Sequence, residues 1–174
     1  MNNKDLIAQY VDTGLMIPEY QINKLPKNVL ETYLRKRLIG LSMTDTIDIR
    51  NINSAEYRFF NNKIKKKVID GILAKYNEFS KKYLADFNDY GMGEYGLPTE
   101  FLNVTPDDLK SYYITNGGPL DKHGFKNLND DLKQEFLKKA IDDEKIYYGF
   151  FKFNELNDDL KKYYMDKGNR LSED

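Results

Sequence analysis

The chain has 174 residues, 40% of them hydrophobic, which is enough for one well-packed domain without covalent cross-links. It contains no cysteine, which excludes disulfides, thiol nucleophiles and thiolate metal sites, and we expect a reducing compartment, the cytoplasm by default. The formal net charge of −1 argues against a surface built as a whole to neutralise phosphates. No run of about 18 apolar residues and no signal-peptide pattern is present, so neither membrane spanning nor export is expected.

Two helices are predicted in the first 40 residues. A short helix from Asp5 to Val11 gives way to a turn at Gly14. Pro26 fits the first turn of a second helix, because its missing N–H is not needed there, and apolar residues follow at spacings of three and four until the predicted end near Gly40. Residues 44–52 alternate loosely, which allows a short strand or an extended connector.

The strongest pattern in the chain is an apolar stripe at helical spacing. It consists of Phe60, Ile64, Val68, Ile72, Tyr76, Phe79, Tyr83 and Phe87. The stripe predicts one helix from about 54 to 88, roughly 50 Å long, as the spine of the fold. Basic residues accompany it, notably Arg58, Lys63, Lys65, Lys66 and Lys67. We interpret them as solvated basic side chains whose aliphatic parts cover the stripe. The alternative is that they form a contact surface for nucleic acid or an acidic partner.

Glycines at 91, 93 and 96 and Pro98 suggest a boundary near residue 97. The chain then has a helical region 1–97, which contains the spine, and a repeat region 98–174, unless both form one continuous domain. Residues 91–96 also match the dinucleotide pattern GxGxxG, but they follow a helix and precede Leu97-Pro98 instead of joining a strand to a helix. We interpret them as a loop, and no cofactor is expected.

The second half contains an internal repeat with an offset of 28 residues. Phe125, Leu128, Asn129, Asp130, Asp131, Leu132 and Lys133 recur as Phe153, Leu156, Asn157, Asp158, Asp159, Leu160 and Lys161. A third copy runs from Leu102 to Ile114, and a degenerate fourth from Ile22 to Leu34. In each copy an apolar anchor precedes a capping residue or proline, and an apolar pair docks the first turns. Each copy therefore predicts a short helix with a fixed start.

No catalytic or metal site is predicted. Pro106, Asp107, Asp108 and Lys110 superficially match a metal-dependent nuclease signature, but these acids lie at a predicted helix start and recur in the other copies, where they face the positive end of the helix. The single histidine, His123, cannot supply a usual zinc site alone. Asp142, Asp143 and Glu144 are consecutive, so they point in different directions.

The repeat as it reads from Leu128 to Leu137 resembles short helix-start repeats in uncharacterised accessory proteins of large tailed bacteriophages. The resemblance covers about a third of the chain and carries no catalytic residues. It implies a small viral protein that engages a host or virion protein in the host cytoplasm.

The sequence thus predicts a mainly α protein, with a long amphipathic spine helix, short helix-start repeats packed on it and room for one short strand pair. We expect a non-enzymatic protein-binding module, such as a phage-encoded inhibitor or modulator of a host protein. Six aromatic residues are the predicted contacts: Tyr90, Tyr95, Tyr112, Tyr147, Tyr148 and Phe151. The alternatives are a nucleic-acid-binding protein that uses the lysine-rich face, and a structural component of a virion or another assembly.

Overall fold

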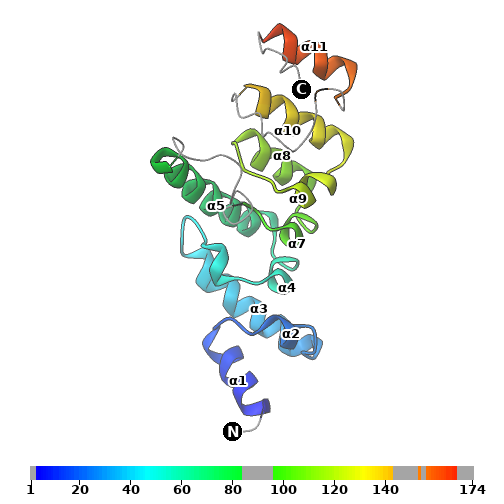
Figure 1. Cartoon of the computed structure of the whole chain (residues 1–174). Helices are drawn as coiled ribbons and strands as arrows, with labels where there is room; N and C mark the ends of the chain where they lie inside the picture. Colours follow the sequence, from blue (N-terminus) through cyan, green and yellow to red (C-terminus); the bar gives the residue numbers. More distant parts are fainter. Residues whose placement is uncertain (1–2, 84–95, 143–152, 154–155, 168–174) are drawn as a thin grey trace.

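The structure is a computed structural model in which residues 3–83, 96–142, 153 and 156–167 are described. Helices dominate these ranges, which confirms the predicted mainly α class, and no strand is found within them. The elements are α1 (Asn3–Thr13), α2 (Glu19–Ile22), α3 (Lys27–Ser42), the 3-10 helix η1 (Ile49–Asn51), α4 (Ser54–Tyr57), α5 (Asn62–Tyr83), α7 (Thr99–Leu102), α8 (Asp107–Thr115), α9 (Lys122–Lys126), α10 (Asp130–Asp142) and α11 (Asp158–Asp166). They stack into an elongated molecule, with α1 at one end and α11 at the other (Figure 1).

The molecule is built from a repeated pair, which consists of a helix of about one turn and a longer helix. Within each pair, the residues that precede the two helices lie eight positions apart. These residues are Pro18 and Pro26, Asn53 and Asn61, Pro98 and Pro106, and Asp121 and Asn129. The asparagines accept a backbone N–H from the third residue of the helix, whereas the prolines fix φ before it starts. A capping side chain or a proline therefore precedes both helices in each pair.

The pairs stack so that each kind of helix forms its own row. The longer helices pack in the order α1, α3, α5, α8, α10 and α11, and the short helices in the order α2, α4, α7 and α9 (Figure 1). Packing of each unit mainly against the units before and after it is the arrangement of a helical solenoid. Within the described residues, α5 is therefore one member of a row and not a spine beneath all the repeats.

In two of the pairs, an equivalent buried hydrogen bond holds the segment of chain that enters the short helix. The N–H of Ile17 donates to the hydroxyl of Tyr33 over 2.9 Å, and the N–H of Leu97 donates to the hydroxyl of Tyr113, also over 2.9 Å. Both tyrosines are fully buried. Their hydroxyls therefore satisfy backbone donors that would otherwise be buried without a partner.

The predicted single helix over 54–88 is wrong in its first part, because α4 ends at Tyr57 and α5 starts five residues later. The side chain of Tyr57 turns into the core, where its ring centroid lies 4.8 Å from that of Phe101. Asn61 then accepts the N–H of Ile64 over 3.0 Å and starts a new helix. Apolar positions on both sides of this turn face the same core, so the stripe continues in the sequence although the helix does not. Residues 84–88 lie outside the described ranges.

Residues 44–52 form an extended connector that includes η1, and not a strand. Ile47 is buried, and its N–H donates to the carbonyl of Lys67 in α5 over 3.1 Å. Asp48 pairs with Arg50 at 2.7 Å and with Lys75 of α5 at 2.5 Å. The Arg50 guanidinium and, after it, the Lys75 ammonium hold the pKa of the Asp48 carboxyl well below its usual range. The connector is therefore fixed to α5 along its length.

The helix starts predicted from the four repeat copies are confirmed. The acidic pairs lie in the first turns of α8, α10 and α11, where carboxylates face the positive end of the helix. The degenerate copy starts α3 directly after Pro26. The first predicted helix corresponds to α1, and α3 ends at Ser42, two residues beyond the predicted end at Gly40.

The largest hydrophobic cluster joins side chains from the connector before α4 to α10, with Ile47 and Phe136 as its limits in the sequence. A second cluster, which includes Val11 and Tyr33, lies between α1, α2, α3 and α4. A third surrounds Leu160 of α11. The largest cluster contains side chains from both sides of residue 97, and the division into regions 1–97 and 98–174 stays a prediction.

Candidate protein-binding surface

Most of the aromatic residues predicted to contact a partner lie outside the described ranges. These are Tyr90, Tyr95, Tyr147, Tyr148 and Phe151. The sixth, Tyr112, is half-buried on α8, and its hydroxyl donates to Asp70 over 2.8 Å and accepts from Lys66 over 2.9 Å. The ammonium of Lys66 also lies 4.0 Å from the Tyr112 ring centroid. Tyr112 thus ties α8 to α5, and its role in partner binding stays a prediction.

The five basic residues proposed to contact nucleic acid do not form one exposed face. Arg58 and Lys63 are exposed, but the ammonium of Lys66 pairs with Asp70 at 3.0 Å. Lys67 donates to the carbonyls of Ser42, over 2.9 Å, and Thr44. These two lysines hold neighbouring segments of the chain on α5.

Lys65 is the most buried of the five, with 6% of its surface exposed. Its ammonium donates to the carbonyl of Val104 over 2.6 Å and lies 5.2 Å from the ring centroid of Tyr57. Burial lowers the pKa of Lys65, and burial raises the pKa of Tyr57 to about 12. Lys65 therefore joins α5 to the turn after α7. Of the five basic residues, Arg58 and Lys63 remain candidate contacts for nucleic acid, and nucleic-acid binding stays a prediction.

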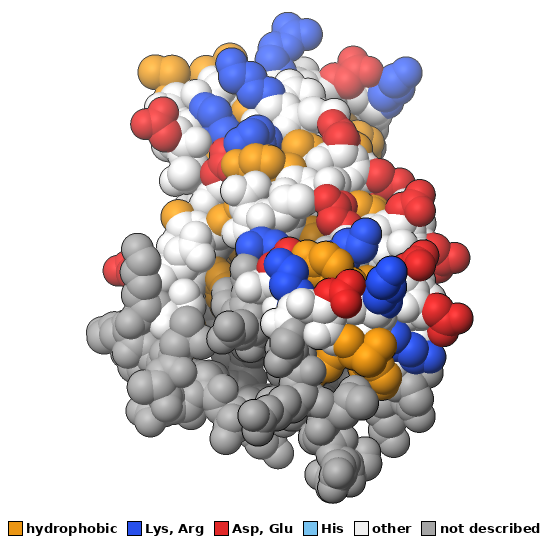
Figure 2. Space-filling view, turned by 90° about the horizontal axis from the view of Figure 1, so that it is seen from above, with side chains coloured by type: hydrophobic (Ala, Val, Ile, Leu, Met, Phe, Trp, Pro, Cys, Tyr) orange, Lys and Arg blue, Asp and Glu red, His pale blue; other side chains and the backbone are white. Residues whose placement is uncertain are grey.

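The charged side chains of opposite sign are mixed on the face that Figure 2 shows. This view looks onto the end of the stack that carries α11, and Lys and Arg side chains alternate there with Asp and Glu and with small apolar areas. Close ion pairs also join side chains of opposite charge in the described residues, for example Lys110 with Asp107 at 2.8 Å and Lys167 with Asp142 at 2.6 Å. Such a surface does not concentrate positive potential as a nucleic-acid groove does.

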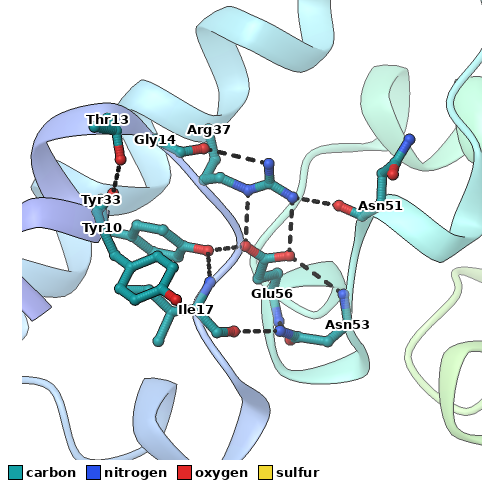
Figure 3. Close-up of polar contacts among 9 residues, drawn as sticks. All are labelled: Tyr10, Thr13, Gly14, Ile17, Tyr33, Arg37, Asn51, Asn53 and Glu56. Carbon is teal, nitrogen blue, oxygen red and sulfur yellow. Dashed lines mark hydrogen bonds and ion pairs between the residues drawn. The ribbon is translucent and has the colours of Figure 1, made fainter. Parts of the chain in front are cut away.

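A buried polar network joins the first two helix pairs (Figure 3). Glu56 of α4 is fully buried, and its carboxylate accepts hydrogen bonds from Tyr33 and from the guanidinium of Arg37, the latter over 2.9 Å. The N–H of Asn53 donates to the same carboxylate over 3.2 Å, and the amide of Asn53 donates to the carbonyl of Ile17 over 2.8 Å. The carboxylate therefore binds α3 to the start of α4 directly, and the segment before α2 joins them through Tyr33 and Asn53.

This network stabilises the fold and leaves no reactive group free. Burial, followed by the hydrogen bond to Glu56, raises the pKa of Tyr33 well above its usual value, so its hydroxyl remains a proton donor to the carboxylate. Arg37 supplies the compensating charge, with only 11% of its side chain exposed. A carboxylate that is buried, paired and fully hydrogen-bonded holds the two pairs in register and offers no free group to a substrate. Sequence reasoning missed it, although the spacing of Asn53 and Glu56 is that of a capping box.

Several large apolar side chains of the described residues are exposed, most of them in the first part of the sequence. Among the described residues, the exposed large apolar side chains are Leu15, Met16, Tyr20, Ile39, Met43, Phe59, Val104 and Met165. Five of these lie within the first 43 residues. Exposed apolar side chains that are neighbours on one element of a soluble protein are candidates for contact with another molecule.

The exposed residues of α3 lie off its buried stripe. Leu34, Leu38 and Leu41 pack against the largest cluster, whereas Ile39 is 62% and Met43 84% exposed. Ile39 and Met43 are four residues apart and so share one face of the helix. The sequence analysis did not single them out, but their position beside the regular stripe of α3 was a usable signal.

The described residues contain no group of three or more acidic or histidine side chains that could hold a metal ion. His123 is exposed in the first turn of α9, and residues 91–95 of the glycine-rich motif lie outside the described ranges. No helix in the described part of the chain is long and apolar enough to cross a membrane. No protein-family model, curated protein or solved structure matches the chain.

Proposed function

We propose that the chain is a non-enzymatic protein-binding module, in which stacked helix pairs present exposed apolar side chains to a partner protein. The observation that carries this proposal is the pair Ile39 and Met43, which lie four residues apart on α3 and are left 62% and 84% exposed. Each exposed side chain of this size is left in water by the fold, and its burial against a partner would be favourable.

The architecture supports the same proposal. Stacked helical repeats have extended surfaces, and a partner can bind several units at once without any change in the core. The residues that differ between pairs can then set specificity, while the caps and buried tyrosines keep the pairs in place. A host or virion protein is the partner class implied by the resemblance of the repeat to phage accessory proteins.

The test is affinity purification of the tagged chain from its native cellular background, at low and at moderate salt, with co-purifying proteins identified by mass spectrometry. We expect one stoichiometric protein that survives moderate salt, because an apolar contact does not depend on screened charges. The matched control is the variant Met43→Asp, which should lose that protein.

Recovery of nucleic acid alone, and only at low salt, would refute protein binding and favour Arg58 and Lys63 as contacts. Sedimentation of the purified chain as a large homo-oligomer would instead favour a structural component of an assembly.

A further inference from the structure

Each short helix is followed by a turn that leads into the long helix of the same pair. These turns form the turn edge, defined here as the six residues around each start, namely 23–28, 58–63, 103–108 and 126–131. In every pair the fourth of the six is the capping residue or proline that precedes the long helix, so equivalent positions can be compared directly. Because α2, α4, α7 and α9 pack in a row, the four turns follow one another in the same order along the stack (Figure 1).

Side-chain contacts join the second turn to the third and the third turn to the fourth. The hydroxyl of Tyr57, directly before the second turn, lies 3.0 Å from the hydroxyl of Thr105 in the third, and both residues are buried. The amide of Asn129 in the fourth turn donates to the carboxylate of Asp107 in the third over 3.0 Å. These three turns are therefore neighbours on the molecule.

The second position of the turn edge is exposed in all four pairs, but its chemistry differs between the centre and the ends. In the second and third turns it is Phe59 and Val104, which are 47% and 36% exposed, whereas in the outer turns it is Lys24 and Asn127. The ammonium of Lys65 donates to the carbonyl of Val104 over 2.6 Å and so holds the third turn against the start of α5. An apolar centre with polar ends is the pattern of a protein–protein contact surface.

The sign of the charge on the turn edge changes at this apolar centre. The first two turns carry four basic residues and no acidic one, whereas the third and fourth carry four acidic residues and one lysine, and all of these side chains are exposed. They are Lys24, Lys27, Arg58 and Lys63 on one side, and Asp107, Asp108, Asp130, Asp131 and Lys126 on the other. Within the described residues, Arg58, Lys63 and Asp108 form no ion pair. The turn edge is thus positive in one half and negative in the other.

We propose that the turn edge is the contact surface of a homodimer whose two-fold axis passes between Phe59 and Val104. A two-fold contact brings the same surface of two copies together in opposite directions. The positive half of one copy then faces the negative half of the other, and the apolar centres meet. A second copy of the chain supplies both halves in the order that charge complementarity requires, which selects it as the occupant of this surface. The dimer is independent of partner binding by Ile39 and Met43 of α3.

The first test is sedimentation velocity of the full chain over a range of protein concentrations, at low and at moderate salt. We expect a dimer whose dissociation constant rises with salt, because salt screens the exposed charges on both sides of the centre. Phe59→Asp should raise the dissociation constant roughly tenfold or more, since it places a charge against an apolar side chain. Met43→Asp, on α3, is the matched control that should leave the dimer unchanged, and thermal unfolding checks that each variant folds.

The second test is charge reversal at Lys63 and Asp108, which hold the sixth position of the second and third turns. In the two-fold dimer each faces the other on the second copy, so Lys63→Glu or Asp108→Lys alone should weaken the dimer roughly tenfold or more. An equal mixture of the two variants should restore the dimer, because the heterodimer has an attractive pair at both places. A contact that leaves these two residues apart does not give this recovery.

Three results would overturn the homodimer. They are a wild-type chain that sediments as a monomer at every concentration, a dimer that Phe59→Asp does not weaken, and a mixture of Lys63→Glu and Asp108→Lys that stays monomeric. Failure of the proposed function is distinguishable from these results by affinity purification. The partner protein should be lost in Met43→Asp and retained in the turn-edge variants, whether or not they dimerise.

Discussion

Replacement of Glu56 by alanine should destabilise the α1 end of the molecule more than any other single truncation on α4. The change leaves the Arg37 guanidinium without a counter-ion in a place where only 11% of its side chain is exposed, and it removes the acceptor of the Tyr33 hydroxyl. Removal of one partner from a buried ion pair costs about 3–5 kcal/mol, because the remaining charge is neither solvated nor paired. For a chain of this size, such a loss corresponds to a fall in Tm of roughly 10 °C.

The assay is thermal and urea unfolding of Glu56→Ala beside the matched control Glu31→Ala, which removes an exposed glutamate of α3. Hydrogen exchange at the N–H groups of Ile17 and Asn53 should increase in Glu56→Ala, because both segments are held by the network. The double variant Glu56→Leu with Arg37→Met should recover most of the lost stability, since an apolar pair needs no counter-ion. A Glu56→Ala chain within about 1 kcal/mol of wild type would refute the reasoning, because it would mean that Arg37 is solvated or paired without Glu56.

Three further changes test the helix pairs and the connector. Gly71→Ala should destabilise the fold by about 1–3 kcal/mol, because its Cβ would lie 2.4 Å from the Ile47 carbonyl oxygen. Gly40→Ala should instead be neutral or stabilising by up to about 1 kcal/mol, and equal effects of the two variants in urea unfolding would contradict this difference. Asn129→Ala should cost about 1 kcal/mol through loss of the cap on α10, and Asn129→Ser should restore most of it; a drop in stability with serine as large as with alanine would argue against capping. The fold lowers the pKa of Asp48, so the pairing of this carboxylate stabilises the protein above the unfolded pKa of about 4, and the stabilisation is lost as pH falls below that value. The variant Asp48→Asn should therefore be less stable than wild type at pH 7 and approach the wild-type stability in acid. A difference in Tm that stays constant between pH 7 and pH 3 would refute this expectation.

Ile39 of α3 and the basic residues of α5 show why exposure could not be read from the sequence. Lys65 and Lys66 look like a solvated face in a helical projection, yet one is buried against Tyr57 and the other is bound to Tyr112. Ile39 looks like a core residue, yet it is exposed. The identity of a residue does not state which neighbouring helix covers it, and the row order that decides this arises only when distant segments pack.

The helix pair at Asn53 and Asn61 shows the opposite situation. The sequence contains the signal for two separate helices there, but the continuous apolar stripe outweighed that signal in the prediction. Two capping residues eight positions apart occur there, just as at Pro18 and Pro26. The continuous apolar stripe favoured one long helix instead, because the residues of a short helix, a turn and a long helix can keep the same spacing while they face one core. Comparison of cap spacing between repeats would have divided the helix correctly.

Local patterns in the sequence were sufficient to predict the helical class and the starts of α3, α8, α10 and α11, and the composition excludes disulfide and thiolate chemistry. These properties depend on local terms, namely caps, proline geometry, helical periodicity and composition, which act within a few residues. Tertiary packing set the stacking of the pairs in two rows, the meeting of Tyr33 and Arg37 with Glu56, and the covering of Gly71 but not of Gly40. These features depend on contacts between residues far apart in the chain, and identical local patterns can therefore end in the core at one position and in solvent at another.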